Sequence, residues 1–355
     1  MNFRLISKEL TNKGLNNCHL EVLIPNNRNY KILAYQHKGD VKGDNQEEMY
    51  LRHVDQDLAT VKFNRFIGLA SERDVELAIS PEYSCPWASI RNVIENKIFP
   101  SLGKIWILGC ESIIPSELKE LIDENTKDEL NFIYDADIVD SEEQKFVDPL
   151  CYIFRTTRID NNHEITVISI QFKTYPMGGI PFEQDGLLRG NYGYRFKNNG
   201  ASINLITIIC SDALDISEQD LNNLDLDQSF LVLHLQLNNS VRVDNFERYK
   251  LFLLNNEPEN SNKDILTLNW ARNSFLANNP TVYGGSAFYM KSKNVNEEDD
   301  RINNNDFKGV FYSYWKKARV NTYFFDYDEY VFLIEIDKAS KRLEPIQNRM
   351  KRGPE

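Results

Sequence analysis

The chain has 355 residues, of which 41% are hydrophobic and 26% are charged, and its formal net charge at pH 7 is -12. Such a chain can bury a sizeable core in one large domain or two smaller ones. The acidic surface repels phosphate backbones, and Lys and Arg gather only in the short stretch 341–352, so we expect no nucleic-acid binding. No apolar run approaches the roughly 20 residues that span a bilayer, so we expect no membrane partner.

The number and spacing of the cysteines favour a reducing compartment. Five are present, at positions 18, 85, 110, 151 and 210, and no two have the Cys-x-x-Cys spacing typical of zinc sites. Residues 1–9 contain no hydrophobic stretch long enough for a signal peptide. Neither an HExxH pattern nor a phosphate-binding glycine loop is present. We therefore expect a cytoplasmic protein with no disulfide framework, no metal and no organic cofactor.

Strands and helices are predicted to interleave along the chain. Apolar runs predict strands at 19–24, 30–36, 75–80, 104–109, 150–156, 164–172, 202–210, 230–236, 265–269, 286–290, 320–325 and 330–336. Helical spacing of apolar residues predicts helices at 48–72, 88–98, 116–125 and 244–255. No linker rich in Pro, Gly or Ser interrupts the series. This predicts a single α/β domain over 30–337, between a polar extension at 1–29 and a polar tail at 338–355.

Three of the predicted strands are followed by a residue that can do chemistry. Glu82 comes after the strand in LAISPE, Lys173 ends VISIQFK and Cys210 ends LITIIC. Ligands of α/β sheets bind beyond strand ends, so these side chains could meet in one pocket. There, a glutamate can take the proton of a thiol as general base, and a lysine can stabilise the thiolate and then an oxyanion.

Each of these residues also has a purely structural explanation. Pro-Glu is common at strand ends, apolar runs often end in a solvated lysine, and a lone cysteine is more often a small buried hydrophobe. His234 lies inside an apolar strand and is expected to be a hydrogen-bonded core residue, and Cys85 is expected to pack. The acidic, Asn-rich run 294–306 is expected to be a solvated loop. The order and context of the three residues must decide between these alternatives.

That order and context resemble the nitrilase superfamily of carbon–nitrogen hydrolases, which is known by a triad of Glu, Lys and Cys. ISPEYS is similar to its Pro-Glu element, QFKTYPMGG to its lysine element and IICSDAL to its cysteine element. Further likeness lies in YKILAYQ, KIWILGCES, LVLHLQLNN, FERYKLFLL, LNWARNS and YGGSAFYM, so the resemblance covers about 30–337. It implies that Glu82 is the general base, Lys173 the stabilising cation and Cys210 the nucleophile.

The resemblance also implies a fold, a reaction and a partner. The implied fold is a four-layer α-β-β-α sandwich, and the reaction is hydrolysis of a non-peptide C–N bond, in an amide or a nitrile, through a thioester on Cys210. The N–H of Ser211 helps the lysine to hold the oxyanion, and Tyr83 and Gln236 line the substrate pocket. No metal or cofactor is required, and a homo-oligomer is expected because members commonly associate. Asp212 resembles the amidases of the family more than its nitrilases.

Some features depart from the family pattern. Glu183 in GIPFEQDG is the best match to a second glutamate but lies slightly further from Lys173 than expected, and the acidic segment 111–148 lengthens the interval between Glu82 and Lys173. Ser211 stands where many members have an aromatic residue, so the resemblance does not name the substrate. Two alternatives stay open. One is transfer of the acyl group to an amine, and the other is a regulatory or binding module within a larger bacterial system such as anti-phage defence.

Overall fold

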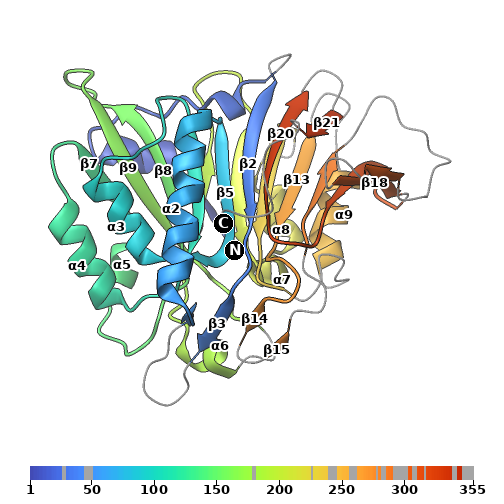
Figure 1. Cartoon of the computed structure of the whole chain (residues 1–355). Coiled ribbons are helices and arrows are strands. Elements are labelled where there is room, and N and C mark those ends of the chain that lie inside the picture. Colours follow the sequence, from blue (N-terminus) through green and yellow to red (C-terminus); the bar gives the residue numbers. More distant parts are fainter. Residues whose placement is uncertain are drawn as a thin grey trace.

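Two large β-sheets stacked face to face form the centre of the molecule, and helices cover their outer faces (Figure 1). The computed structural model describes residues 1–25, 29–43, 51–177, 181–224, 227–238, 246–255, 262–276, 279–280, 285–290, 303–305, 310–315, 317–337 and 342–345. One apolar cluster lies between the sheets, a second lies between one sheet and its helices, and a third lies between the other sheet and its helices. The predicted four-layer α-β-β-α sandwich is confirmed.

The two large sheets are accompanied by a small third one. In the described residues, the eight-stranded sheet has the order β21 (Arg342–Pro345), β20 (Tyr330–Asp337), β2 (Tyr30–Gln36), β5 (Leu77–Cys85), β6 (Ile105–Cys110), β8 (Pro149–Thr157), β9 (Glu164–Phe172) and β7 (Leu130–Ile133). The nine-stranded sheet, with the same restriction, has the order β1 (Phe3–Leu5), β10 (Gly193–Phe196), β11 (Asn204–Ile209), β12 (Phe230–Leu235), β13 (Lys263–Leu268), β16 (Ala287–Met290), β19 (Val320–Phe325), β18 (Val310–Trp315) and β17 (Asn303–Asn305). The small sheet has the order β15 (Asn279–Pro280), β14 (Phe275–Leu276), β3 (Asp40–Gly43) and β4 (Leu51–His53).

The described helices do not all lie in the outer layers, because the first of them buries Ile6 and Leu10 in the core between the sheets. They are α1 (Ile6–Asn12), α2 (Gln56–Arg73), α3 (Trp87–Glu95), α4 (Pro115–Asn125), α5 (Ala136–Val139), α6 (Pro181–Gly186), α7 (Asp212–Asp215), α8 (Glu218–Asn222) and α9 (Glu247–Asn255). Helices α2, α3 and α4 pack on the eight-stranded sheet, and α8 and α9 pack on the nine-stranded sheet. Figure 1 shows α3 and α4 on one side of the sandwich and α8 and α9 on the other. Among the helices that the structure describes, none is long and apolar enough to cross a membrane.

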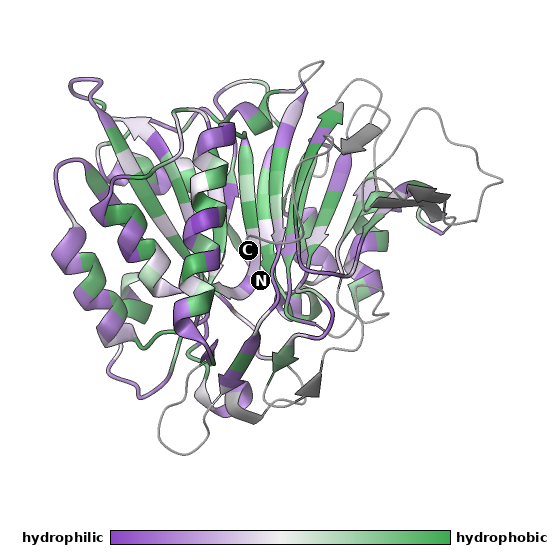
Figure 2. Cartoon of the chain, in the orientation of Figure 1, coloured by the Kyte–Doolittle hydropathy of each residue, from purple (hydrophilic) through white to green (hydrophobic). Residues whose placement is uncertain are grey.

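Central strands are buried on both faces, so each contributes to two cores. In β5, Leu77 and Ile79 pack between the sheets, whereas Ala78 packs toward the helices. In β11, Leu205 packs between the sheets and Ile206 packs toward α8 and α9. Successive side chains of a strand point to opposite faces, so strands buried on both faces appear as continuous apolar runs. Figure 2 shows this as hydrophobic strands beneath helices that carry both hydrophobic and hydrophilic residues.

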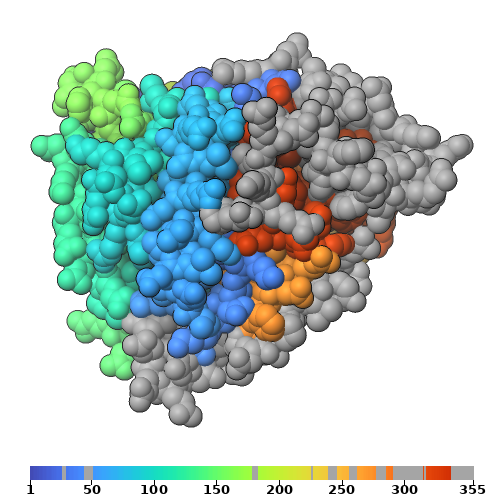
Figure 3. All heavy atoms as spheres, viewed as in Figure 1, coloured from blue at the N-terminus to red at the C-terminus, as the bar shows by residue number. Residues whose placement is uncertain are grey.

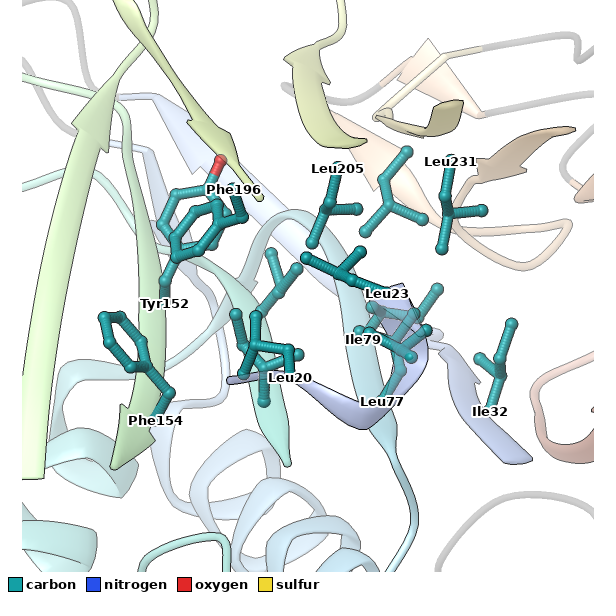
Figure 4. Packing of buried hydrophobic residues seen from close by; sticks show 14 of the residues in the cluster. Leu20, Leu23, Ile32, Leu77, Ile79, Tyr152, Phe154, Phe196, Leu205 and Leu231 are labelled. Atoms are coloured by element: carbon teal, nitrogen blue, oxygen red, sulfur yellow. The ribbon is translucent and has the colours of Figure 1, made fainter. Parts of the chain in front are cut away.

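Residues 1–25 belong to the packed structure, although the sequence predicted an extension there. Strand β1 pairs in parallel with β10 at the edge of the nine-stranded sheet. Leu20 and Leu23 are fully buried between the sheets (Figure 4). The predicted strand at 19–24 is wrong, because Glu21–Leu23 form a 3-10 helix. That turn sends the consecutive side chains of Val22 and Leu23 into the same core, which the alternating geometry of a strand does not allow.

The helix predicted at 48–72 begins later, at Gln56. The side chain of Asp55 accepts a hydrogen bond from the N–H of Leu58 at 2.9 Å and so caps the first turn of α2. The residues just before it, Leu51–His53, form β4 instead. In the space-filling view, the atoms of α2 cover the middle of this face of the molecule (Figure 3).

Several segments that looked peripheral in the sequence take part in the sheets. The acidic segment 111–148 supplies α4, α5 and β7, and β7 pairs in parallel with β9. Strand β21 forms within the predicted polar tail, and β17 forms within the predicted loop at 294–306. The rest of that tail and of that loop lies outside the described residues. The predicted homo-oligomer stays a prediction.

Candidate active site

Glu82, Lys173 and Cys210 come from both sheets and lie together. The Nζ atom of Lys173 lies 2.6 Å from Oε1 of Glu82, and the charges of both groups act on the thiol of Cys210. All three residues are at most 1% exposed. Lys173 follows β9 and Cys210 follows β11, just before the short helix α7. The structure thus brings together residues that are distant in the sequence, with 91 positions between Glu82 and Lys173 alone.

A bulge in β5 sets the direction of the Glu82 side chain. The pairing of β5 with β6 is regular up to Ser80 and shifts in register before Cys85, and Tyr83 has a φ of 58°. The strand continues to Cys85 and contains Glu82, so the prediction of a strand that ends at Ser80, before Glu82, is wrong. A bulge leaves residues out of the regular hydrogen-bonded ladder. The missing N–H of Pro81 therefore breaks no ladder hydrogen bond at this point.

The two ends of Glu82 are held by different parts of the chain. Its Oε2 accepts a hydrogen bond from the backbone N–H of Leu237 at 2.9 Å. Its backbone carbonyl accepts one from Nε1 of Trp270 at 2.7 Å. With Lys173 on Oε1, both carboxylate oxygens have a donor. The carboxylate is therefore fixed in position before any ligand binds.

Gly109 of β6 leaves the space that this bulge needs. A Cβ atom at Gly109 would lie 2.2 Å from the carbonyl oxygen of Pro81 and 2.7 Å from Cα of Glu82. We therefore expect Gly109→Ala to lower the free energy of unfolding by about 2 kcal/mol, because the backbone has to shift. Urea denaturation measures this change. Gly68→Ala in α2 is the matched control, because nothing lies within 4 Å of the added methyl. That control should stabilise the protein by about 0.5–1 kcal/mol. Equal changes in the two variants would contradict the prediction.

The ammonium of Lys173 lies among three carboxylates. Besides Glu82, its Nζ lies 2.9 Å from Oε1 and 3.0 Å from Oε2 of Glu183. It is also 3.6 Å from Oδ2 of Asp148. Burial alone would lower the pKa of Lys173, but these three carboxylates raise it well above its usual value. Oxygens of Glu82, Asp148 and Glu183 lie within 4.8 Å of one another. The lysine is a cation, and its ammonium lies among these oxygens.

Cys210 stands at a sharp turn between β11 and α7. Its φ is 39°, a conformation that costs energy for a residue with a side chain. Its N–H donates to the carbonyl of Leu235 at 2.8 Å, and its own carbonyl accepts from Nε2 of His234 at 2.9 Å. The hydroxyl of Ser211 donates to the carbonyl of Tyr175 at 2.7 Å. These bonds hold the backbone on both sides of the thiol.

Asp212 ties the turn after Cys210 to the segment after Lys173. Its Oδ1 accepts from the N–H of Thr174 at 2.8 Å, the hydroxyl of Thr174 at 3.0 Å and the N–H of Tyr175 at 2.8 Å. Burial raises the pKa of Asp212 to about 7, although these donors oppose the change. The thiol and the ammonium are therefore held at a fixed separation through one carboxyl group.

The electrostatics of the site keep Cys210 in its thiol form at rest. Burial raises the pKa of Cys210 well above its usual value, and the charge of Glu82 raises it further. The ammonium of Lys173 and the N–H of Leu237 act in the opposite direction. Burial also raises the pKa of Glu82, against the effect of Lys173. A carboxylate of raised proton affinity beside a thiol can take the thiol proton as a bond to sulfur forms.

The remaining predicted site residues are all buried close to these groups. Glu183 binds Lys173 through both oxygens, accepts from the hydroxyl of Tyr83 at 2.8 Å and also accepts from the N–H of Met177. Tyr83 therefore orients the second glutamate. Gln236 is fully buried beside the ring of His234, and its Oε1 has no hydrogen-bond partner within the described part of the chain. Ser211 is the N-cap residue of α7. Its oxyanion role and a pocket role for Gln236 stay predictions.

Two residues of the site were missed or undervalued in the sequence. Asp148 is buried and lies opposite Lys173, because Pro149 pairs with Phe172 at the ends of β8 and β9. An aspartate between apolar residues, in FVDPL, is the signal that could have found it. His234 is a buried core histidine, as expected, but it also holds the carbonyl of Cys210.

Comparisons with known proteins give only distant structural similarity. No family model matches the sequence, and no curated protein matches it significantly. Similar solved structures include glutamine-dependent NAD+ synthetase from Acinetobacter baumannii in complex with ADP, at 14% identity and a TM-score of 0.44, over 91% of this chain and 48% of that one. They also include an amidase from Nesterenkonia sp., at 9% identity and a TM-score of 0.41, over 86% of this chain and 92% of that one. A mutant of the amidase from Nesterenkonia AN1, described as belonging to the nitrilase superfamily, has 9% identity and a TM-score of 0.40 over 87% and 92% of the two chains. The chain thus spans about half of the synthetase, and we argue its function from the side chains of the site.

Proposed function

We propose that the chain is a carbon–nitrogen hydrolase of the nitrilase superfamily, which cleaves a small amide or nitrile through a thioester on Cys210. One observation supports this most strongly. The buried ammonium of Lys173 contacts two glutamates, at 2.6 Å and 2.9 Å, next to a thiol at a strained turn. Groups of this kind are costly to bury, and packing alone does not require an acid, a base and a thiol in one place.

In the first half of the proposed reaction, Glu82 takes the proton of Cys210 while the sulfur bonds to the carbonyl carbon of the amide. The carbonyl oxygen becomes an oxyanion, which the ammonium of Lys173 and the N–H of Ser211 stabilise. Glu82 then gives the proton to the leaving nitrogen. The C–N bond breaks, ammonia or an amine departs, and a thioester remains on Cys210.

In the second half, water attacks the thioester carbon. Glu82 takes a proton from that water, and Lys173 again stabilises the oxyanion. The C–S bond breaks, Glu82 returns the proton to the sulfur, and a carboxylic acid leaves. An amine in place of water would give acyl transfer, with the same first half. The nature of the product therefore distinguishes hydrolysis from transfer.

Trapping of the acyl group tests this proposal. The protein is incubated with p-nitrophenyl acetate, and separately with a series of primary amides and aliphatic nitriles, and its peptides are then weighed by mass spectrometry. We expect an acyl group on the peptide that carries Cys210, and we expect hydroxylamine to release it as a hydroxamate. The other four cysteines should stay unmodified, because burial raises the pKa of each thiol and no ammonium of the described residues is among the groups that lower it.

The variant Glu82→Gln is expected to form this acyl group about 100- to 10,000-fold more slowly, because it lacks the general base. Equal rates in the two proteins would contradict the role of Glu82. If none of the probes acylates Cys210, the proposal of an enzyme is wrong and the binding or regulatory module becomes the better description. When Cys210 is acylated, addition of a primary amine tells whether an N-acyl product forms in place of the free acid.

A further inference from the structure

Asp148 is buried in the site, and the reaction proposed above does not use it. The residue is 1% exposed and lies directly before β8. Its backbone carbonyl accepts from the N–H of Lys173 at 2.9 Å, which fixes its place opposite the lysine. Neither of its carboxylate oxygens accepts a hydrogen bond from any group in the described residues. A buried carboxylate without a donor is rare, because its desolvation is not compensated.

Two other carboxyl groups lie close to Asp148. Oxygens of Asp148, Glu82 and Glu183 lie within 4.8 Å of one another, so the carboxyl of Asp148 faces the carboxyls of both glutamates. Two ionised carboxylates only accept hydrogen bonds, so such a contact would be repulsive. It becomes a hydrogen bond when one of the two groups carries a proton.

The charges of the cluster lead to the same conclusion. Three carboxyl groups share the ammonium of Lys173, whose Nζ lies 2.6 Å from Glu82, 2.9 Å from Glu183 and 3.6 Å from Asp148. Asp148 has the longest of these contacts and therefore the weakest stabilisation of its ionised form. In the part of the chain that the structure describes, the hydroxyl of Tyr83 and the thiol of Cys210 also face the cluster, and neither carries a positive charge.

We propose that Asp148 is a neutral carboxylic acid at neutral pH, and that it donates a hydrogen bond to Glu82. Asp148 is then a positioning residue. Its proton removes one negative charge from the cluster and adds a donor to those already supplied by Lys173 and Leu237, so that Glu82 stays ionised and oriented toward the thiol. Burial and the neighbouring charge of Glu82 raise the pKa of Asp148 well above its usual value, as this assignment requires. Only the positioning role rests on the proposed function.

Infrared spectroscopy tests the protonation without any substrate. A protonated carboxylic acid has a C=O stretching band that carboxylates and amides lack. We expect this band in the wild-type protein at about pH 8, above the pKa of about 7 of Asp212, and we expect its loss in Asp148→Asn. The control Asp57→Asn, at an exposed position of α2, should keep the band. If the band is absent from the wild type, or survives in Asp148→Asn, the assignment is wrong.

The rate of Cys210 acylation by p-nitrophenyl acetate, measured against pH, tests the positioning role. The amide of Asp148→Asn is neutral and donates a hydrogen bond, so its rate should stay within about threefold of the wild type and the acidic limb of its pH profile should not move. Asp148→Leu has no donor and should react about 10- to 100-fold more slowly. If Asp148 were ionised, Asp148→Asn would remove a charge next to Glu82 and shift the acidic limb by about one unit or more toward lower pH. That shift would overturn the proposal. If no variant is acylated, the proposed function fails, while the infrared result still decides the state of Asp148.

Discussion

Lys173→Met is expected to lower the free energy of unfolding by about 3–5 kcal/mol, because it leaves Glu82 and Glu183 buried without their cation. The methionine fills a similar volume, so the change reports the lost charge and not a cavity. The loss should become smaller as the pH falls, because protonation of the carboxyls removes the repulsion that the missing ammonium had balanced. Urea denaturation at several pH values measures both effects.

The matched control for this variant is Lys97→Met. Lys97 also binds a glutamate, Glu129, at 2.9 Å, but the two side chains are 73% and 65% exposed. Exposed ion pairs contribute about 0–1 kcal/mol, so this control should leave stability nearly unchanged. A similar small change in Lys173→Met would mean that the buried lysine does not balance the charge of the cluster. The double variant Lys173→Met with Glu183→Gln should recover part of the loss, because it removes one of the unpaired charges.

Cys210→Ser is expected to reduce turnover by a factor of about 10,000 or more while the protein stays folded. A hydroxyl has almost the shape of a thiol, but it holds its proton much more tightly, and Glu82 is too weak a base to remove it. The backbone bonds of Cys210 to Leu235 and His234 do not involve the sulfur and should remain. Product formation from the substrate found by acyl trapping measures turnover, and circular dichroism checks the fold.

Cys18→Ser is the control for this second variant. Cys18 is buried to the same extent as Cys210, at 1% exposure, but it packs in the core between the sheets. Its replacement should reduce stability and leave turnover per folded molecule unchanged. Turnover by Cys210→Ser at the wild-type rate would show that another group is the nucleophile.

Much of the fold could be predicted because strands buried on both faces form continuous apolar runs. The runs at 30–36, 164–172 and 230–236 correspond to β2, β9 and β12. Prediction failed where packing overrides the local pattern. Residues 19–24 appear strand-like, but Glu21–Leu23 form a 3-10 helix between the sheets. Strand β5 passes through Pro81 because Gly109 on its neighbour has no side chain at the bulge.

The candidate site could be predicted only in part, for a related reason. Lys173 and Cys210 each follow a recognisable strand, Glu82 lies within one, and the order of the three along the chain resembles a known triad. Nothing in the local sequence marks Asp148 as a partner of Lys173. Their proximity depends on the register of β8 and β9, which pairs Pro149 with Phe172. The states of the ionisable groups are likewise set by burial and by neighbours that are distant in the sequence.

Local chemistry and periodicity thus determine which residues can form strands, and which side chains carry a base, an ammonium or a thiol at the strand ends. Three properties depend on tertiary structure alone: the bulge that turns Glu82 toward Lys173, the strained turn that holds Cys210, and the gathering of three carboxyl groups around the ammonium of Lys173. The physical reason is that these properties arise from distances between segments and from the exclusion of water, and neither exists until the two sheets have packed together.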